Sequence, residues 1–182
     1  MGKGCGMSET NQIVKQINEA FKMRYRPEKL IASDSLTSFE IDEVNQFCVD
    51  SYSSISERLL DDNYEVLSAV TPDAFAYYLP MVIKYSLENH SIDNMSADSI
   101  IGYIDRSDKF ENWEEFFVKR WSLFSTEELS SIEEWMIWFS GEIKDEYFES
   151  KLTRGFDVIQ ELKRGCSGVA SPLFENQRSQ SH

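Results

Sequence analysis

The chain has 182 residues, of which 41% are hydrophobic and 13% aromatic, which suits one domain with a core and argues against global disorder. Its 18 basic and 32 acidic residues give a net charge of −14, which repels nucleic acid and anionic lipid and excludes both as expected partners. No apolar run is long enough to cross a bilayer, and residues 1–7 lack the apolar stretch of a signal peptide, so we expect a cytoplasmic protein.

Residues 1–8 are expected to form a flexible leader, residues 9–165 a single helical domain, and residues 166–182 a flexible tail. In the first half of the domain, Ile13, Ile17 and Phe21 share one face of a predicted amphipathic helix. Two helix starts follow in which a serine or threonine precedes a glutamate by three residues, the spacing of a capping box. These pairs are Thr37 with Glu40 and Ser54 with Glu57.

The segment Thr71-Pro72-Asp73 is the strongest helix start in the chain. The threonine can cap the helix, proline fits its first turn, and the aspartate complements the positive end of the helix dipole. Pro80 lies inside this helix and is expected to kink it. A wide apolar face follows the start, made of Phe75, Tyr78, Leu79, Val82, Ile83 and Leu87.

The second half of the chain continues the helical pattern. Ser96 is expected to cap a helix, although residues 99–104 could instead form an edge strand. Residues 113–121 predict another helix, and the capping-box pair of Ser125 and Glu128 begins the next, which Gly141 either ends or interrupts. The helical period then runs to Gly165, a natural stop. The sequence therefore predicts an all-α fold, a compact multi-helix bundle with short helices and a disordered C-terminal tail.

Motifs that would carry chemistry are missing. The chain has no glycine-rich phosphate loop and no HExxH, and its three cysteines and two histidines are widely separated. Two carboxylate pairs, Glu111 with Glu114 and Glu142 with Glu146, are spaced to share a helix face, so a metal-dependent enzyme remains an alternative, but no other ligands accompany them. We expect no catalytic, cofactor-binding or metal-binding residues and no enzymatic activity.

The acidic residues are concentrated in the middle of the chain. Residues 31–150 carry a net charge of −19, whereas residues 1–30 sum to +3 and residues 151–182 to +2. Such a surface attracts basic proteins and speeds their encounter, although solubility alone would also explain it. Trp138 lies at the edge of an apolar helix stripe, where it either packs in the core or forms an exposed anchor among carboxylates. The predicted partner-binding residues are Glu133, Glu134, Trp138, Glu142, Asp145 and Glu146.

Residues 71–80, with the sequence TPDAFAYYLP, resemble the TPxAFxYYLP motif of an uncharacterised bacterial family, a domain of unknown function. The resemblance extends to residues 13–21 and to the helix beginning at Ser125, and covers about residues 10 to 145. It implies a shared fold and names no activity, because the roles of the motif residues are structural. They cap the helix, form its first turn, pack in the core and bend the helix.

Small acidic proteins of this character resemble the immunity proteins that bacteria encode beside secreted toxins, including those of type VI secretion. This resemblance implies a cytoplasmic immunity protein that neutralises a cognate basic toxin, such as a nuclease, through its acidic surface. A non-enzymatic adaptor or regulatory module is the alternative. A homodimer also remains open.

Overall fold

The structure, a computed structural model, describes residues 8–33, 36–90, 95–143 and 145–166. These residues contain no strand, and the predicted all-α fold is confirmed. Apart from Ser8 and Cys166, the predicted leader and tail lie outside the described residues. The α-helices are α1 (Glu9–Ala20), α2 (Ser38–Phe47), α3 (Glu57–Asp62), α4 (Pro72–Asn89), α5 (Met95–Ile104), α6 (Glu115–Trp121), α7 (Thr126–Glu142) and α8 (Glu146–Cys166). Short 3₁₀ turns are η1 (Tyr52–Ser54), η2 (Val66–Ser68) and η3 (Phe110–Asn112).

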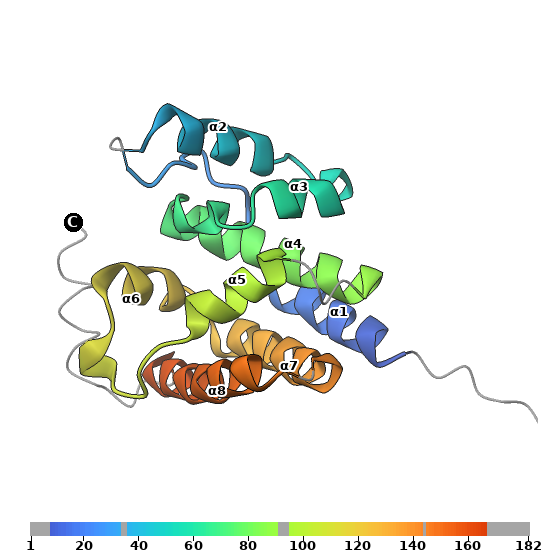
Figure 1. Cartoon of the computed structure of the whole chain (residues 1–182), viewed down its shortest axis with the longest axis vertical. Coiled ribbons are helices and arrows are strands. Elements are labelled where there is room, and N and C mark those ends of the chain that lie inside the picture. Colours follow the sequence, from blue (N-terminus) through green and yellow to red (C-terminus); the bar gives the residue numbers. More distant parts are fainter. Residues whose placement is uncertain (1–7, 34–35, 91–94, 144, 167–182) are drawn as a thin grey trace, which may run out of the picture.

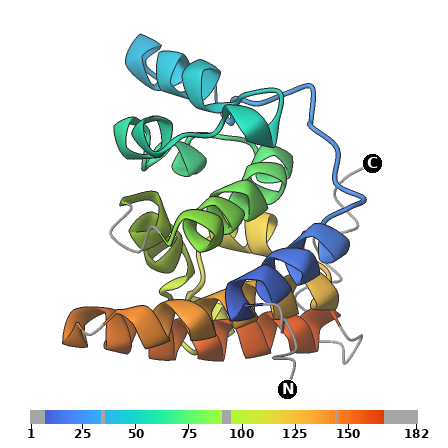
Figure 2. The same ribbon diagram turned by 90° about the vertical axis from the view of Figure 1, so that its right-hand side faces the viewer.

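The helices lie in three tiers. Helices α2 and α3 form one end, α4 and α5 cross the middle, and α1, α7 and α8 close the opposite end (Figure 1). Figure 2 shows the same tiers from the side, with α2 standing out at the top and α7 and α8 running side by side at the bottom. Helix α4 packs against α1, α5, α6 and α7, so it is the centre of the bundle. None of the described helices combines the length and the apolar character that a membrane crossing needs.

The start of α4 forms as its sequence predicts and is tied to distant segments. The Thr71 hydroxyl accepts a hydrogen bond from the Ala74 amide at 3.2 Å and donates one to the Lys29 carbonyl at 2.9 Å. Ile31 and Val70 form an isolated antiparallel bridge beside this cap. The Arg120 guanidinium, on a residue only 7% exposed, donates to the Val70 carbonyl at 3.0 Å. The segment just before α4 is therefore fixed by contacts with the chain around residues 29–31 and with Arg120 of α6.

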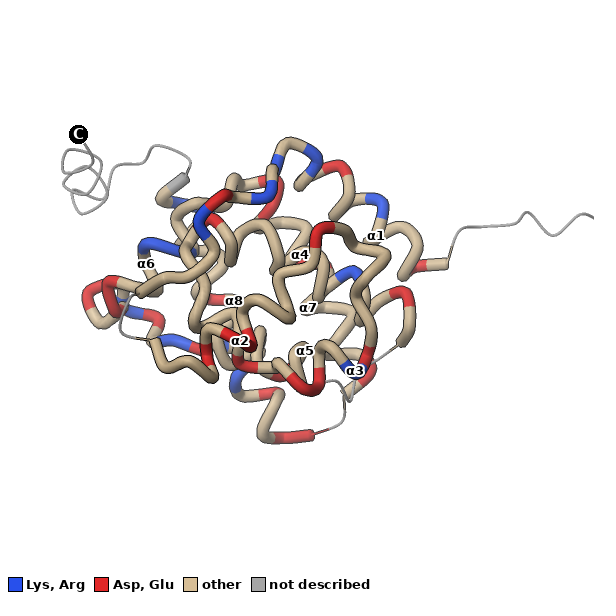
Figure 3. Tube along the Cα trace, turned by 90° about the horizontal axis from the view of Figure 1, so that it is seen from above, with Lys and Arg blue, Asp and Glu red and all other residues tan. Residues whose placement is uncertain are grey.

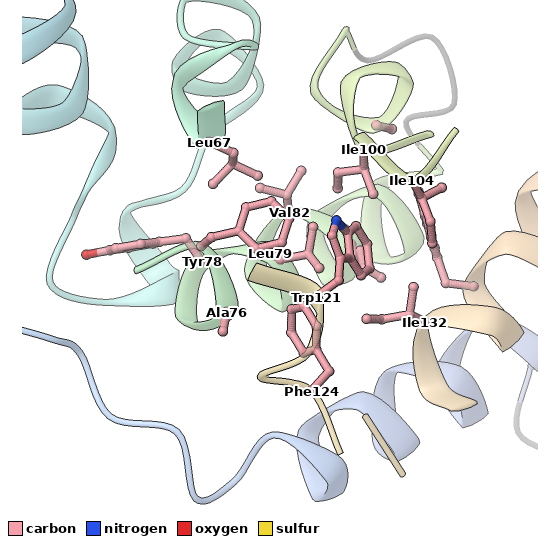
Figure 4. Packing of buried hydrophobic residues seen from close by; sticks show 14 of the residues in the cluster. Leu67, Ala76, Tyr78, Leu79, Val82, Ile100, Ile104, Trp121, Phe124 and Ile132 are labelled. Carbon is pink, nitrogen blue, oxygen red and sulfur yellow. The ribbon is translucent and has the colours of Figure 1, made fainter. Parts of the chain in front are cut away.

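Aromatic side chains fill the space between the tiers. Trp121 lies at the middle of the core, with Leu79, Ile104 and Ile132 around it (Figure 4). Its ring lies 5.5 Å from the ring of Phe75 in an edge-on arrangement, a geometry that aromatic pairs favour. The buried indole of Trp135 donates to the Ser86 hydroxyl at 2.9 Å, so its polar atom is satisfied.

Three predicted helix boundaries are wrong. Helix α3 is capped by Ser56, whose hydroxyl accepts from the Leu59 amide at 3.3 Å, and Ser54 closes the preceding 3₁₀ turn instead. Ser96 does not cap α5 but lies within its first turn, buried, and donates to the Leu60 carbonyl at 2.7 Å. Helix α8 continues through Gly165 to Cys166.

The alternative edge strand over residues 99–104 is also wrong. This segment is the second half of α5, and the apolar residues Ile100, Ile101 and Ile104 are fully buried. Their spacing places them on one helical face toward α4 and α8, where a strand would divide them between two faces. Gly141 is the penultimate residue of α7, so the helix ends close to it, the first of the two predicted outcomes.

Candidate protein-binding surface

The candidate site lies where α7 turns into α8. Helix α7 begins at the capping box of Ser125 and Glu128, as predicted, and runs for 17 residues. At its far end the Ile143 amide donates to the Phe139 carbonyl, and the chain reverses direction into α8. The Asp145 carboxylate accepts from the Tyr147 amide at 2.8 Å, which satisfies a free amide at the start of α8.

Three of the six predicted partner-binding residues come together at this turn. Glu142 ends α7, Asp145 precedes α8 and Glu146 begins it, and all three are exposed. Among the described ion pairs none involves these carboxylates. Residues 134–149 contain five acidic residues and one basic residue. The turn thus presents negative charge to solvent.

Glu133 does not belong to this exposed group. Its carboxylate accepts hydrogen bonds at 2.5 Å from both Lys163 and Gln160 of α8, and its side chain is 21% exposed. Because α7 and α8 pack side by side, this carboxylate serves their contact and is not available to a partner. Glu134, its exposed neighbour, points to another side of α7 and lines a groove against α1.

The exposed-anchor interpretation of Trp138 is wrong, and its alternative, core packing, is confirmed. Trp138 is 6% exposed, and its ring centre lies 6.2 Å from that of His90, the residue that follows α4. Helices α1, α4 and α8 all pack against α7, so its buried face is wider than a stripe with a single neighbour. This wide face covers Trp138 as well as Trp135 and Phe139.

Two other side chains supply the apolar surface that Trp138 does not. Ile137 is 49% exposed on α7, and Tyr147 is 61% exposed at the start of α8. The ammonium of Lys151 lies 4.1 Å from the centre of the Tyr147 ring. Sequence reasoning missed both residues, although Ile137 falls outside the stripe that contains Ile132 and Phe139 and its exposure could have been inferred. We define the α7–α8 corner as Ile137, Glu142, Asp145, Glu146 and Tyr147.

A second acidic surface covers α2 and α3, the tier that Figure 3 views from above. Residues 38–65 contain eight acidic residues and one basic residue, Arg58. Phe39 is 69% exposed at the start of α2, and Asp42 is exposed one turn further along the same helix. Sequence reasoning did not single out this surface, which has one exposed aromatic side chain where the α7–α8 corner has two large apolar ones.

A groove of about 850 Å³ lies between α1 and the first half of α7. Except for Ala20, its lining residues are polar or charged, and both signs of charge occur. The α1 wall consists of Gln12, Lys15, Gln16, Glu19, Ala20 and the nearby Lys22, and the α7 wall of Ser125, Thr126, Glu127, Ser130, Ser131 and Glu134.

The carboxylate pairs suggested as metal ligands are not arranged for that role. Glu142 and Glu146 lie on different helices and do not share a helix face, and the Glu114 carboxylate accepts from Arg106 at 3.0 Å. Within residues 8–33, 36–90, 95–143 and 145–166, no group of three or more histidine, cysteine, aspartate or glutamate side chains could hold a metal ion. What the surface of α7 and α8 offers is charge and apolar contact.

No protein-family model, curated protein or solved structure matches the chain. The similarity of residues 71–80 to a family motif therefore stays a prediction.

Proposed function

We propose that this chain is a non-enzymatic, cytoplasmic immunity protein that binds and neutralises a cognate basic toxin, such as a nuclease of a type VI-like secretion system. The observation that carries the proposal is the α7–α8 corner, where the exposed carboxylates of Glu142, Asp145 and Glu146 lie next to the exposed Tyr147 along the chain and the exposed Ile137 lies near the end of α7. Protein interfaces combine apolar anchors with a polar rim, and complementary charge speeds the encounter.

The corner is also suited to binding without rearrangement. It joins two of the longest helices of the fold, and their contact is fixed by the ion pair between Glu133 and Lys163. A surface held on rigid helices loses little conformational freedom when it binds, so more of the contact energy contributes to affinity. An inhibitor that must occupy the cleft of a toxin benefits from such a preformed edge.

The test uses the purified toxin domain encoded beside this gene and measures association by stopped-flow fluorescence at several salt concentrations. The corner variant carries Glu142→Gln, Asp145→Asn and Glu146→Gln, and the matched control carries Asp42→Asn, Glu57→Gln and Asp61→Asn on α2 and α3. Both variants lose three negative charges, so they have the same net charge.

We expect the corner variant to associate about tenfold more slowly at low salt and to show a weaker salt dependence, because the removed charges face the partner. The control should change the rate by less than about twofold, because its charges lie at the opposite end of the bundle, away from the proposed docking surface. Equal slowing in both variants would indicate a general charge effect and not docking at the corner.

A growth assay tests neutralisation itself. Cells that produce the toxin should survive when this chain is co-produced, and the corner variant should protect them less. If the wild-type chain neither binds the toxin nor protects the cells, the immunity proposal is wrong, and a regulatory adaptor becomes the better explanation.

A further inference from the structure

The groove between α1 and α7 differs electrostatically from the rest of this acidic chain. Its lining contains two lysines, Lys15 and Lys22, and three glutamates, Glu19, Glu127 and Glu134, which sum to −1. Two molecules with a net charge of −14 repel each other, and the repulsion is weakest where their facing surfaces carry balanced charge. The groove is such a surface.

The charged residues of the groove are divided unevenly between its walls. The α1 wall carries both lysines, and the α7 wall carries Glu127 and Glu134. Glu19, on the α1 wall, is paired with Lys22, and both side chains are mostly exposed, at 71% and 57%. An exposed pair of this kind contributes little stability and can rearrange at low cost when a new partner approaches.

The two helices run in opposite directions, so the end of α1 lies near the start of α7 (Figure 1). Arg24, two residues after Lys22, binds the carboxylate of Glu128, the residue that follows Glu127. Lys22 and Glu127 therefore lie toward the same end of the groove, and Lys15 and Glu134 lie toward its other end. Lys15 lies seven residues before Lys22, and Glu134 lies seven residues after Glu127, a spacing that corresponds in α7 to about 10 Å of axial rise.

From this arrangement we infer that the groove is the interface for a second copy of this chain, related by a two-fold axis parallel to α1 and α7. In that arrangement α1 of each copy lies over α7 of the other. Lys22 then faces Glu127 of the second copy, and Lys15 faces Glu134 of the second copy. By symmetry each contact occurs twice.

The same charges exclude the other simple two-fold arrangement. An axis running across the groove would place α1 over α1 and α7 over α7, so that lysines would meet lysines and glutamates would meet glutamates. Like charges facing each other at an interface are unfavourable. The remaining lining residues are alanine, serine, threonine and glutamine, which allow close approach and can form hydrogen bonds between the copies.

This dimer would leave most of the α7–α8 corner open. Glu142, Asp145, Glu146 and Tyr147 do not line the groove. The inference is therefore independent of the proposed function, and the dimer would present two corners.

Sedimentation equilibrium of the full chain at low ionic strength tests the inference. The wild type should form a reversible dimer, and Lys15→Glu and Glu134→Lys should each raise its dissociation constant about tenfold, because each substitution converts two attractive contacts into repulsive ones. The control Lys119→Glu replaces an exposed lysine of α6 that does not line the groove, and it should leave the dissociation constant unchanged.

Mixing the two single variants gives the sharper measurement. In a mixed dimer each reversed charge faces the other, so an equimolar mixture of Lys15→Glu and Glu134→Lys chains should regain dimers at the wild-type concentration. Charge pairing within one chain cannot produce this recovery. A wild type that stays monomeric, single variants that dimerise normally, or a mixture that remains monomeric would each overturn the inference.

Discussion

Arg24 and Glu128, separated by 104 residues, form two hydrogen bonds of 2.7 Å between the guanidinium and the two carboxylate oxygens. The same carboxylate accepts from the Ser125 amide at 2.7 Å, so it also completes the capping box of α7. The Glu128 side chain is only 7% exposed. One buried carboxylate thus fixes the start of α7 and attaches the segment after α1 to it.

Replacing Glu128 by glutamine should lower the free energy of unfolding by about 2 kcal/mol, because the substitution removes a charge-assisted bidentate contact and leaves Arg24 without its counter-ion. Urea denaturation followed by circular dichroism measures the loss. The control is Glu127→Gln, an exposed neighbour in the same helical turn, which should leave stability close to that of the wild type. A similar loss in both variants would contradict a special role for Glu128.

The Tyr78 hydroxyl connects α4 to two other segments. It accepts from the Arg26 Nε at 3.0 Å and donates to the Val49 carbonyl at 3.0 Å. Tyr78→Phe leaves both groups without this partner and should cost about 1–2 kcal/mol in denaturation experiments. A variant as stable as the wild type would show that water replaces both hydrogen bonds.

Alkaline pH should destabilise the fold through the same region. Burial raises the pKa of Tyr78 from 10.0 to about 12 and that of Cys48 from 9.0 to about 11. Above pH about 9 the unfolded chain releases these protons before the folded chain does, so the free energy of unfolding falls between pH about 9 and 12. Denaturation at several pH values measures the decline, which should be shallower in Tyr78→Phe; an identical slope would rule out a contribution from this phenol.

Gly155 allows α8 to pack closely against Met136 and Ile104. A Cβ atom at this position would lie 2.8 Å from the Met136 terminal methyl carbon and 3.0 Å from Ile104 Cγ2. Gly155→Val should therefore cost roughly 1–3 kcal/mol through overpacking. Gly102→Ala is the control, because nothing lies within 4 Å of an added Cβ there, and the better helix former should add about 0.5–1 kcal/mol. Equal stability of Gly155→Val and the wild type would show that α8 can shift freely.

Calorimetric titration tests the expectation that the chain is not a metal-dependent enzyme. Injection of magnesium or zinc into the full chain should give no saturable heat, because no further ligands accompany the exposed carboxylates of the corner in the part of the chain that the structure describes. A stoichiometric isotherm that disappears in Glu142→Gln would instead support a cation site at the turn and would weaken the docking proposal.

Helix starts and apolar helix faces could be predicted from the sequence, because they depend on residues that are close together in the chain. The caps at Thr37, Thr71 and Ser125 are recognised from residues within one helical turn, and all three form as predicted. The same holds for the apolar face of α4, whose spacing alone places Phe75 and Leu79 in the core. Local hydrogen bonds and helical periodicity are encoded by neighbouring residues, so no tertiary information is needed.

The candidate site was only partly predictable, because exposure depends on packing between distant segments. Glu133 forms an ion pair with Lys163, which lies 30 residues away in the chain. Trp138 is buried in contact with His90, the residue that follows α4. Ser96 bonds the carbonyl of Leu60, a partner that no local pattern indicates. The exposed position of Tyr147 likewise follows from where α8 begins, which the helical period does not determine.

The packing of α1 against α4 and α7 has a consequence for the order of folding during synthesis. Ile13, Ile17 and Phe21 leave the ribosome before α4 and α7, the helices against which α1 packs, have been synthesised. Until α7 has been translated, the part of the apolar side of α1 that packs against α7 remains uncovered and open to chaperones or to neighbouring nascent chains. A ribosome stalled before α7 would therefore hold an incomplete bundle in which α1 is only partly covered.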